Sequence, residues 1–169
     1  MNWTKILIAG AALLLSSCCG KWYNFRGVNI PADVQTFSVD FFGNEAQLVN
    51  PQLSMNFTEK LKNKFQGETR LGLSSSSGDF KLSGAIKDYR VEPAALNNTT
   101  GTSQNKFTIS VRVTFECPKH PEKNFTDREF SFFRTFDATE NFSGVESNLS
   151  ADISDNIIQQ IFAAIALDW

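Results

Sequence analysis

A stretch in the second half of the chain alternates strictly between apolar and polar side chains, and this pattern constrains the fold more than any other feature. The apolar residues are Phe107, Ile109, Val111, Val113 and Phe115, and the residues between them are Thr108, Ser110, Arg112 and Thr114. A period of two is typical of a β-strand with one buried face and one face in water. The sequence therefore predicts a sheet whose apolar face is covered by a second layer.

Two amphipathic helices are predicted that can form this layer. The first begins at Asn50-Pro51, because Asn caps free backbone donors and Pro tolerates the first helical position, and it ends at Gly67. The second opens with a capping box formed by Ser143 and Glu146 and continues to the end of the chain. Apolar residues recur every four positions: Leu53, Phe57, Leu61 and Phe65 in the first helix, and Val145, Leu149, Ile153, Ile157, Ile161 and Ile165 in the second. We interpret both stripes as core-facing, and docking on a partner is the alternative.

Further strands are predicted on either side of the central one. They are Val34–Phe42, Phe80–Val91 and Phe125–Phe136. In the first of them, Phe37, Val39 and Phe41 are expected to share the buried side. In the second, the apolar parity changes after Ile86, which predicts a bulge near Lys87-Asp88.

Two segments between these strands leave alternatives open. Arg70–Leu73 is either a parallel edge strand of its own or the lead into the next strand. Pro93–Asn105 is a polar loop, long enough to indicate either disorder or a function. The predicted fold is thus an α+β two-layer sandwich in the order β-α-β-β-β-α. Its sheet is mostly antiparallel with four strands, or five if Arg70–Leu73 forms one, and both helices pack on one face.

The N-terminus has the order of a secretory signal. Lys5 precedes the apolar run Ile6–Leu15, which is too short to span a bilayer, and two serines then lead to a cysteine. Leu15-Ser16-Ser17-Cys18 resembles the bacterial lipobox, whose Cys receives a diacylglycerol and an N-acyl chain and becomes residue one. We therefore predict a signal peptide at 1–17, a lipidated anchor and tether at 18–30, and one domain at 31–169. Several acyl chains hold such a protein stably on a membrane.

Composition excludes several classes of function. A net charge of −2, from 16 basic and 18 acidic residues, provides no basic field for nucleic acid. The single His120 lies in a turn between prolines, and no nucleophile–base or metal-ligand spacing is present, so neither an enzyme nor a metal site is expected. Cys117 is interpreted as a buried apolar residue, although a disulfide with Cys19 remains an alternative. No cofactor is expected beyond the lipids on Cys18.

An ordered set of short matches resembles one family. The set is Cys18-Cys19-Gly20, Tyr23-x-Phe25, Val34-x-Thr36-Phe37, Asn50-Pro51-x-Leu53-Ser54, Phe57-Thr58-Glu59-x-Leu61, Thr69-Arg70-Leu71, Gly84-x-Ile86-x-x-Tyr89 and the closing Trp169. Together these residues resemble the LptE family of lipopolysaccharide-assembly lipoproteins. The resemblance implies a protein anchored at the outer membrane and facing the periplasm. It also implies that the protein plugs the LptD-type β-barrel and helps it to assemble and to receive lipopolysaccharide.

Two candidate contact regions follow from that expectation. Lipopolysaccharide carries phosphates, which pair with Arg in bidentate geometry or with Lys as a point charge. We predict that Arg112, with Lys106, Arg128 and Arg134, forms a lipopolysaccharide-binding surface. The second hypothesis is that the loop Pro93–Asn105 reaches into the barrel. Two competing functions are a lipoprotein subunit of another envelope complex, such as a transporter-associated lipoprotein, and an anchored enzyme such as a cell-wall hydrolase.

Overall fold

The computed structural model describes residues 28–47, 50–94 and 103–169. The predicted signal peptide, Cys18 and most of the predicted tether therefore lie outside the described residues. So do residues 95–102 of the predicted loop. The domain that follows the tether is described almost completely.

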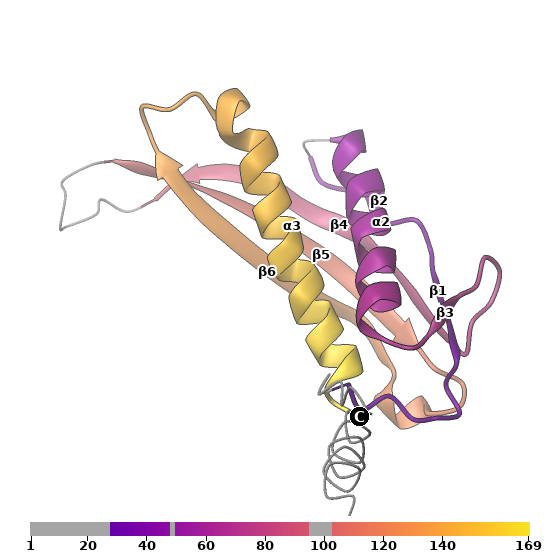
Figure 1. Ribbon diagram of the computed structural model, residues 1–169. Coiled ribbons are helices and arrows are strands. Elements are labelled where there is room, and N and C mark those ends of the chain that lie inside the picture. Colours follow the sequence, from indigo (N-terminus) through magenta and orange to yellow (C-terminus); the bar gives the residue numbers. More distant parts are fainter. Residues whose placement is uncertain (1–27, 48–49, 95–102) are drawn as a thin grey trace, which may run out of the picture.

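The described elements form one mixed sheet and two long helices (Figure 1). In chain order they are β1 (Thr36–Val39), β2 (Gly43–Asn44), α2 (Pro51–Glu68), β3 (Gly72–Leu73), β4 (Phe80–Pro93), β5 (Gln104–Glu116), the 3₁₀ turn η2 (Pro121–Lys123), β6 (Phe125–Asp137) and α3 (Phe142–Ala166). The sheet has six strands in the order β3-β1-β4-β5-β6, with β2 also paired to β4. Figure 1 shows α2 and α3 side by side over the same face of the sheet.

The predicted α+β architecture, with two helices on one face, is confirmed, but the predicted sheet was wrong in strand number and direction. Strands β4, β5 and β6 form an antiparallel meander, whereas β1 runs parallel to β3 and β4, and β2 runs parallel to β4. The parallel half arises because the chain crosses from β1 to β4 through α2, and such a crossover returns the chain in the same direction. Gly72–Leu73 is a separate parallel edge strand, one of the two alternatives predicted for that segment.

The predicted strand Val34–Phe42 is interrupted. The chain leaves β1 after Val39 and re-enters the sheet as β2 at Gly43. This break changes the parity of the side chains, so Phe42 is fully buried against Phe57, with ring centroids 5.4 Å apart, and Phe41 is 64% exposed. Phe41 was expected inside the core, and the interruption explains why it is outside.

Two local predictions about β4 have different outcomes. The register between β4 and β5 shifts between Ile86 and Asp88, which confirms the predicted bulge. The predicted loop Pro93–Asn105, however, is shorter than expected, because pairing continues to the partners Pro93 and Asn105. Position 84 needs a glycine for a steric reason: a Cβ there would overlap the carbonyl of Arg112 and lie 2.7 Å from the Phe42 ring.

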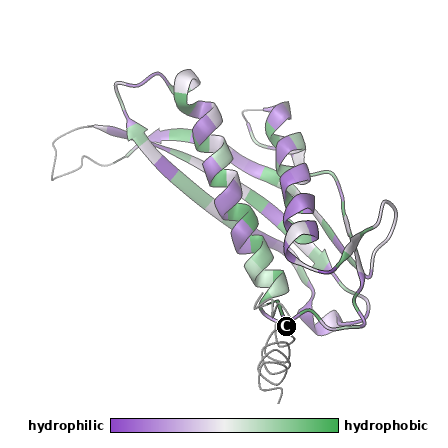
Figure 2. Ribbon diagram, viewed as in Figure 1, coloured by the Kyte–Doolittle hydropathy of each residue, from purple (hydrophilic) through white to green (hydrophobic). Residues whose placement is uncertain are grey.

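The core lies between the sheet and the helices and is rich in phenylalanine. Phe65 of α2 contacts Phe37 of β1 at 5.6 Å and Phe162 of α3 at 5.2 Å between ring centroids. Each buried phenylalanine contributes about 2–3 kcal/mol by leaving water, and tilted ring pairs add about 1 kcal/mol. The apolar stripes of α2 and α3 pack into the core of the domain itself, as expected, with Val145 and Leu149 only partly buried. Figure 2 shows that α3 becomes more hydrophobic toward its C-terminal half.

The predicted capping box of α3 was wrong. The helix begins at Phe142 and is capped by Asn141, whose side-chain oxygen accepts the Ser143 N–H at 3.1 Å. Glu146 instead turns toward the sheet and α2, where its carboxylate accepts hydrogen bonds from the Tyr89 hydroxyl and from the Asn50 amide. A tertiary contact therefore replaces the local one.

Candidate functional site

The four basic residues predicted to form one surface lie on two faces of the sheet. Lys106 and Arg112 alternate with the buried residues of β5, so they lie on the face that the helices leave uncovered. In β6, Arg128 is paired with Val113 and Arg134 with Phe107, both of which are buried under the helices. Arg128 and Arg134 therefore lie on the helix-covered face, at its edge.

The two β6 arginines have structural contacts. The Arg134 Nε forms an ion pair with Asp152 of α3, and its guanidinium lies 4.6 Å from the centroid of the Phe132 ring. The Arg128 guanidinium lies 5.5 Å from the Phe125 ring and 5.2 Å from the Phe130 ring. Cation–π contacts of this kind contribute about 0.5–1 kcal/mol at exposed sites. These arginines cover aromatic rings at the edge of the sheet, and Arg134 also links β6 to α3.

The uncovered face of the sheet, which we call the open sheet face, is formed along β5 by Lys106, Thr108, Ser110, Arg112 and Thr114 and by their neighbours in β4 and β6. Most charges on and beside it are paired with each other. The Nζ–carboxylate distance is 2.6 Å for Lys106–Glu92 and 2.8 Å for Lys81–Asp40, and Lys87 pairs with Glu45. Exposed pairs of this kind contribute at most about 1 kcal/mol each. These pairs make the surface mostly polar and internally neutralised, although Phe133, paired with Thr108 on this face, is 52% exposed.

Arg112 differs from its neighbours on this face. Its Nε lies 3.9 Å from Asp127 Oδ1, which is too far for a hydrogen bond, and its side chain is 44% exposed. It lines a cavity of about 250 Å³ together with Glu45, Lys87 and Asp127. The pKa of Glu45 is lowered, mainly by the Lys87 hydrogen bond and charge and to a smaller extent by the charge of Arg112. Arg112 therefore has an exposed guanidinium that forms no hydrogen bond within the described residues.

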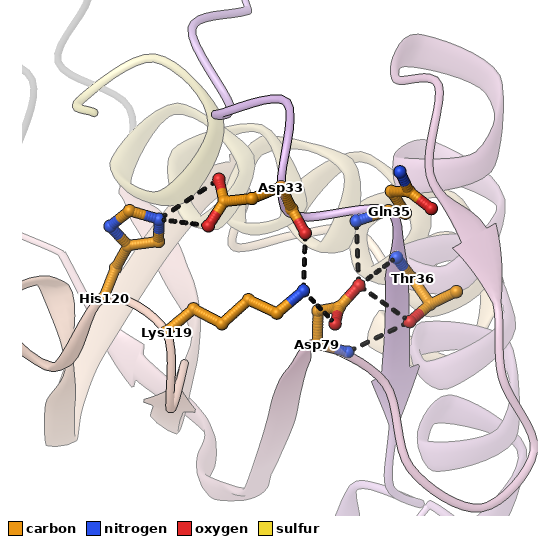
Figure 3. A network of polar contacts seen from close by, with 6 residues as sticks. All are labelled: Asp33, Gln35, Thr36, Asp79, Lys119 and His120. Atoms are coloured by element: carbon orange, nitrogen blue, oxygen red, sulfur yellow. Dashed lines mark hydrogen bonds and ion pairs between the residues drawn. The ribbon is translucent and has the colours of Figure 1, made fainter.

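A polar network ties the start of the domain to the β5–β6 turn (Figure 3). The Asp79 carboxylate accepts hydrogen bonds from the backbone N–H groups of Gln35 and Thr36 and from Lys119 Nζ at 2.6 Å. Lys119 also donates to the Asp33 carbonyl. The Lys119 hydrogen bond, followed by the two backbone donors, holds the pKa of Asp79 well below its usual range. This network was not anticipated, because its members are separated by some 40 residues and more in sequence and share no local pattern.

His120 belongs to the same region and has the contacts of a structural residue. Its Nε2 lies 3.1 Å from Asp33 Oδ2, its Nδ1 lies 3.4 Å from Glu122 Oε1, and its ring meets the Trp169 ring edge-on. No hydroxyl or thiol of the described residues is hydrogen-bonded to it. Across residues 28–47, 50–94 and 103–169, no three His, Cys, Asp or Glu side chains are grouped closely enough to hold a metal ion. Cys117 is buried, as predicted, with a free thiol.

The fold is that of a small sheet-and-two-helix domain that occurs in bacterial lipoproteins. A minor lipoprotein from Acinetobacter baumannii is 16% identical, with a TM-score of 0.53 over 80% of this chain and 95% of that one. A putative neuraminyllactose-binding hemagglutinin homologue from Helicobacter pylori is 7% identical, with a TM-score of 0.53 over 86% and 90% of the two chains. At these identities the likeness concerns the fold alone. No curated protein matches the chain.

The family model of LptE, described as lipopolysaccharide-assembly, matches residues 34–165. The match covers most of the chain, and the protein belongs to the LptE family. This result confirms the resemblance found in the sequence. Members of the family are outer-membrane lipoproteins that serve lipopolysaccharide assembly. Among the described residues, no helix is long and apolar enough to cross a membrane.

Proposed function

We propose that this protein is the plug and assembly partner of an LptD-type β-barrel and assists the insertion of lipopolysaccharide at the cell surface. The observation that carries the proposal is the family match over residues 34–165. The mostly polar open sheet face supports it, because a plug in a water-filled lumen needs a polar surface rather than an apolar one. On this proposal the protein binds and assembles and catalyses no reaction. It needs no cofactor other than the diacylglycerol and N-acyl lipids on Cys18.

An affinity purification tests the partnership directly. The tagged, lipidated protein is isolated from gently solubilised outer membranes, and the co-purifying proteins are identified by mass spectrometry. We expect a stoichiometric LptD-like barrel. Recovery of inner-membrane transporter subunits without a barrel would refute the proposal and favour a transporter-associated lipoprotein.

Direct contact with lipopolysaccharide is proposed at Arg112, because a guanidinium with free donors can form bidentate hydrogen bonds to phosphate. We expect Arg112→Glu to reduce photocrosslinking to lipopolysaccharide by about tenfold, since the charge at the contact is reversed. Co-purification of the barrel should stay unchanged. Lys62→Glu on the outer side of α2 is the matched control and should crosslink normally. Equal crosslinking of Arg112→Glu and the native protein would exclude this contact.

The segment between β4 and β5 is the second proposed contact, with the barrel itself. The hairpin is closed by a hydrogen bond from the Ala94 N–H to the Gln104 carbonyl at 2.8 Å, so residues 95–102 can be exchanged for a short Gly-Ser turn without disturbing described pairs. We expect this replacement to lower the yield of assembled barrel by several-fold, since loop tips frequently carry binding contacts. An undiminished yield would rule out a role for the segment.

A further inference from the structure

A groove with polar and apolar lining residues separates the N-terminal halves of α2 and α3, on the side of the molecule opposite the open sheet face. The two helices run side by side in the same direction (Figure 1), and the groove between them has a volume of about 300 Å³. Its polar lining includes Gln52 and Asn56 of α2 and Ser143, Glu146, Ser147 and Ser150 of α3, and Leu53, Phe57 and Ala151 form its apolar part. A volume of this size lies at the lower end of the range for small-molecule sites. We call it the interhelical groove.

Among the described residues, Glu146 is the only carboxylate that lines the groove, and it is held there by neutral donors. Its Oε1 accepts hydrogen bonds from the Tyr89 hydroxyl and from Asn50 Nδ2, the latter at 3.2 Å. Burial, and then the hydrogen bond to Glu146, raise the pKa of Tyr89 to about 12, so the phenol keeps its proton and stays a donor at neutral pH. Among the described residues, Glu146 has no cationic partner, and its Oε2 accepts no hydrogen bond. One oxygen of a half-buried carboxylate therefore remains available to a ligand.

The remaining polar groups of the groove indicate the chemistry of that ligand. Gln52 Nε2 donates to Asn56 Oδ1 at 2.9 Å, which leaves Gln52 Oε1 to accept and Asn56 Nδ2 to donate, and the hydroxyls of Ser143 and Ser147 can do both. The one basic side chain in the lining, Lys60, forms an ion pair with Asp155 at 2.7 Å. A free phosphate would face the Glu146 carboxylate without a free cation, and a wholly apolar ligand would leave the Ser143 and Ser147 hydroxyls without a partner. Adjacent hydroxyl groups on a sugar ring supply the matching donors and acceptors.

We propose that the interhelical groove is a binding site for a neutral, hydroxyl-rich saccharide of one or two rings, with Glu146 accepting hydrogen bonds from its hydroxyls. Lipopolysaccharide and the glycan of the cell wall both carry such sugars. Taking lipopolysaccharide as the source rests on the proposed function, whereas the site itself does not. This contact is separate from the phosphate contact proposed at Arg112, since the two lie on opposite sides of the sheet.

Saturation-transfer NMR on the full-length lipidated protein, in a detergent that has no sugar headgroup, tests the site and detects weak binding. Two probes distinguish the sources. One is the delipidated and dephosphorylated core oligosaccharide of lipopolysaccharide, and the other is the β-1,4-linked disaccharide of N-acetylglucosamine. We expect saturation transfer to at least one probe from the native protein.

Three variants show whether the signal comes from the groove. Ser147→Trp fills the groove from an exposed helix position and should abolish the transfer. Glu146→Gln keeps the shape and removes the charge, so about tenfold weaker binding is expected. Asn148→Trp, at the neighbouring exposed position of α3 outside the lining, is the matched control and should bind as the native protein does.

The outcomes separate this proposal from the proposed function. Transfer to the core oligosaccharide that Ser147→Trp abolishes supports the site with lipopolysaccharide as its source. Transfer to the N-acetylglucosamine disaccharide alone, again lost in Ser147→Trp, supports the site and excludes that source, while the partnership with the barrel is still decided by co-purification. The absence of transfer to either probe, or transfer that persists in Ser147→Trp, overturns the proposal.

Discussion

Asp79 illustrates how one carboxylate can hold together distant parts of this domain. Its side chain accepts backbone hydrogen bonds at 2.8 Å and 2.9 Å from Gln35 and Thr36, and it pairs with Lys119 from the β5–β6 turn. The Asp79 N–H in turn donates to the Thr36 carbonyl at 2.9 Å. These contacts fix the start of β1 against the β5–β6 turn on the other side of β4.

The pKa of Asp79 makes the stability of the protein depend on pH. Because the pKa in the folded state is depressed, the contribution is fully present above the unfolded-state pKa, near 3.8, and is lost as the pH falls through and below that value. We expect Asp79→Asn to lower the free energy of unfolding by about 2 kcal/mol at neutral pH, since charge-assisted hydrogen bonds are lost. The free energy of unfolding of the variant should also fall less steeply than that of the native protein as the pH is lowered. Urea unfolding at neutral and acidic pH measures both effects.

Glu59→Gln is the control for Asp79→Asn, because Glu59 forms an exposed pair with Lys62 on the outer side of α2. Such a pair contributes little to stability. Unfolding curves of Asp79→Asn that follow those of Glu59→Gln at every pH would contradict the role assigned to the network.

At the scale of elements, the phenylalanine rings join the two helices to each other and to the sheet. Phe162 is 3% exposed and contacts Phe65 across the boundary between α3 and α2, while Phe65 also contacts Phe80 of β4 at 5.8 Å. Lys64 Nζ lies 5.2 Å from the centroid of the Phe162 ring and covers it on the solvent side. The apolar face of α3 is therefore part of the core and not a free surface for a partner.

Phe162→Ala should reduce the free energy of unfolding by about 3–5 kcal/mol, because the substitution leaves a cavity between the helices. Thermal or urea unfolding of the isolated protein measures the change. Phe41→Ala removes an equally large side chain that is 64% exposed, and it should change the stability by less than about 0.5 kcal/mol. Similar losses for the two variants would show that α3 is not held by this contact.

At the scale of the whole molecule, the start of the described chain, the β5–β6 turn and the C-terminus meet at one end. The Asn29 N–H donates to the Ala166 carbonyl at 3.0 Å, and Lys123 Nζ donates to the Asp168 carbonyl at 2.7 Å. Nine residues lie between Cys18 and Val28, and the ten residue steps that join them reach at most about 35 Å. With lipids on Cys18, this end of the domain would therefore be the one nearer to the membrane.

The proposed lipidation predicts where variants of the full chain are found in the cell. Cys18→Ala should release the protein from the outer-membrane fraction, because several acyl chains are needed for a stable anchor. Fractionation and mass spectrometry of the N-terminal peptide measure the location and the lipid mass. Cys19→Ala is the matched control and should stay anchored. Retention of Cys18→Ala in the membrane in a strain without the barrel partner would argue against this anchor.

The sequence by itself determined the elements whose signal is local. The alternation in Phe107–Phe115 and the apolar repeats of α2 and α3 are set by the periods of a strand and a helix, so the two-layer α+β class followed from them. The parity change near Lys87-Asp88 likewise located the bulge. Ordered matches along the chain were also enough to indicate the family.

Only the tertiary structure decided which residues come together. The parallel placement of β1, the two faces occupied by Arg112 and Arg134, and the turn of Glu146 away from its helix end toward Tyr89 all depend on chain segments distant in sequence. Periodicity assigns a side chain to one face of its own element, but it does not specify the neighbouring strand or the opposing helix. Those contacts are selected by the packing of the whole core, in which local preferences such as a capping box yield to longer-range hydrogen bonds.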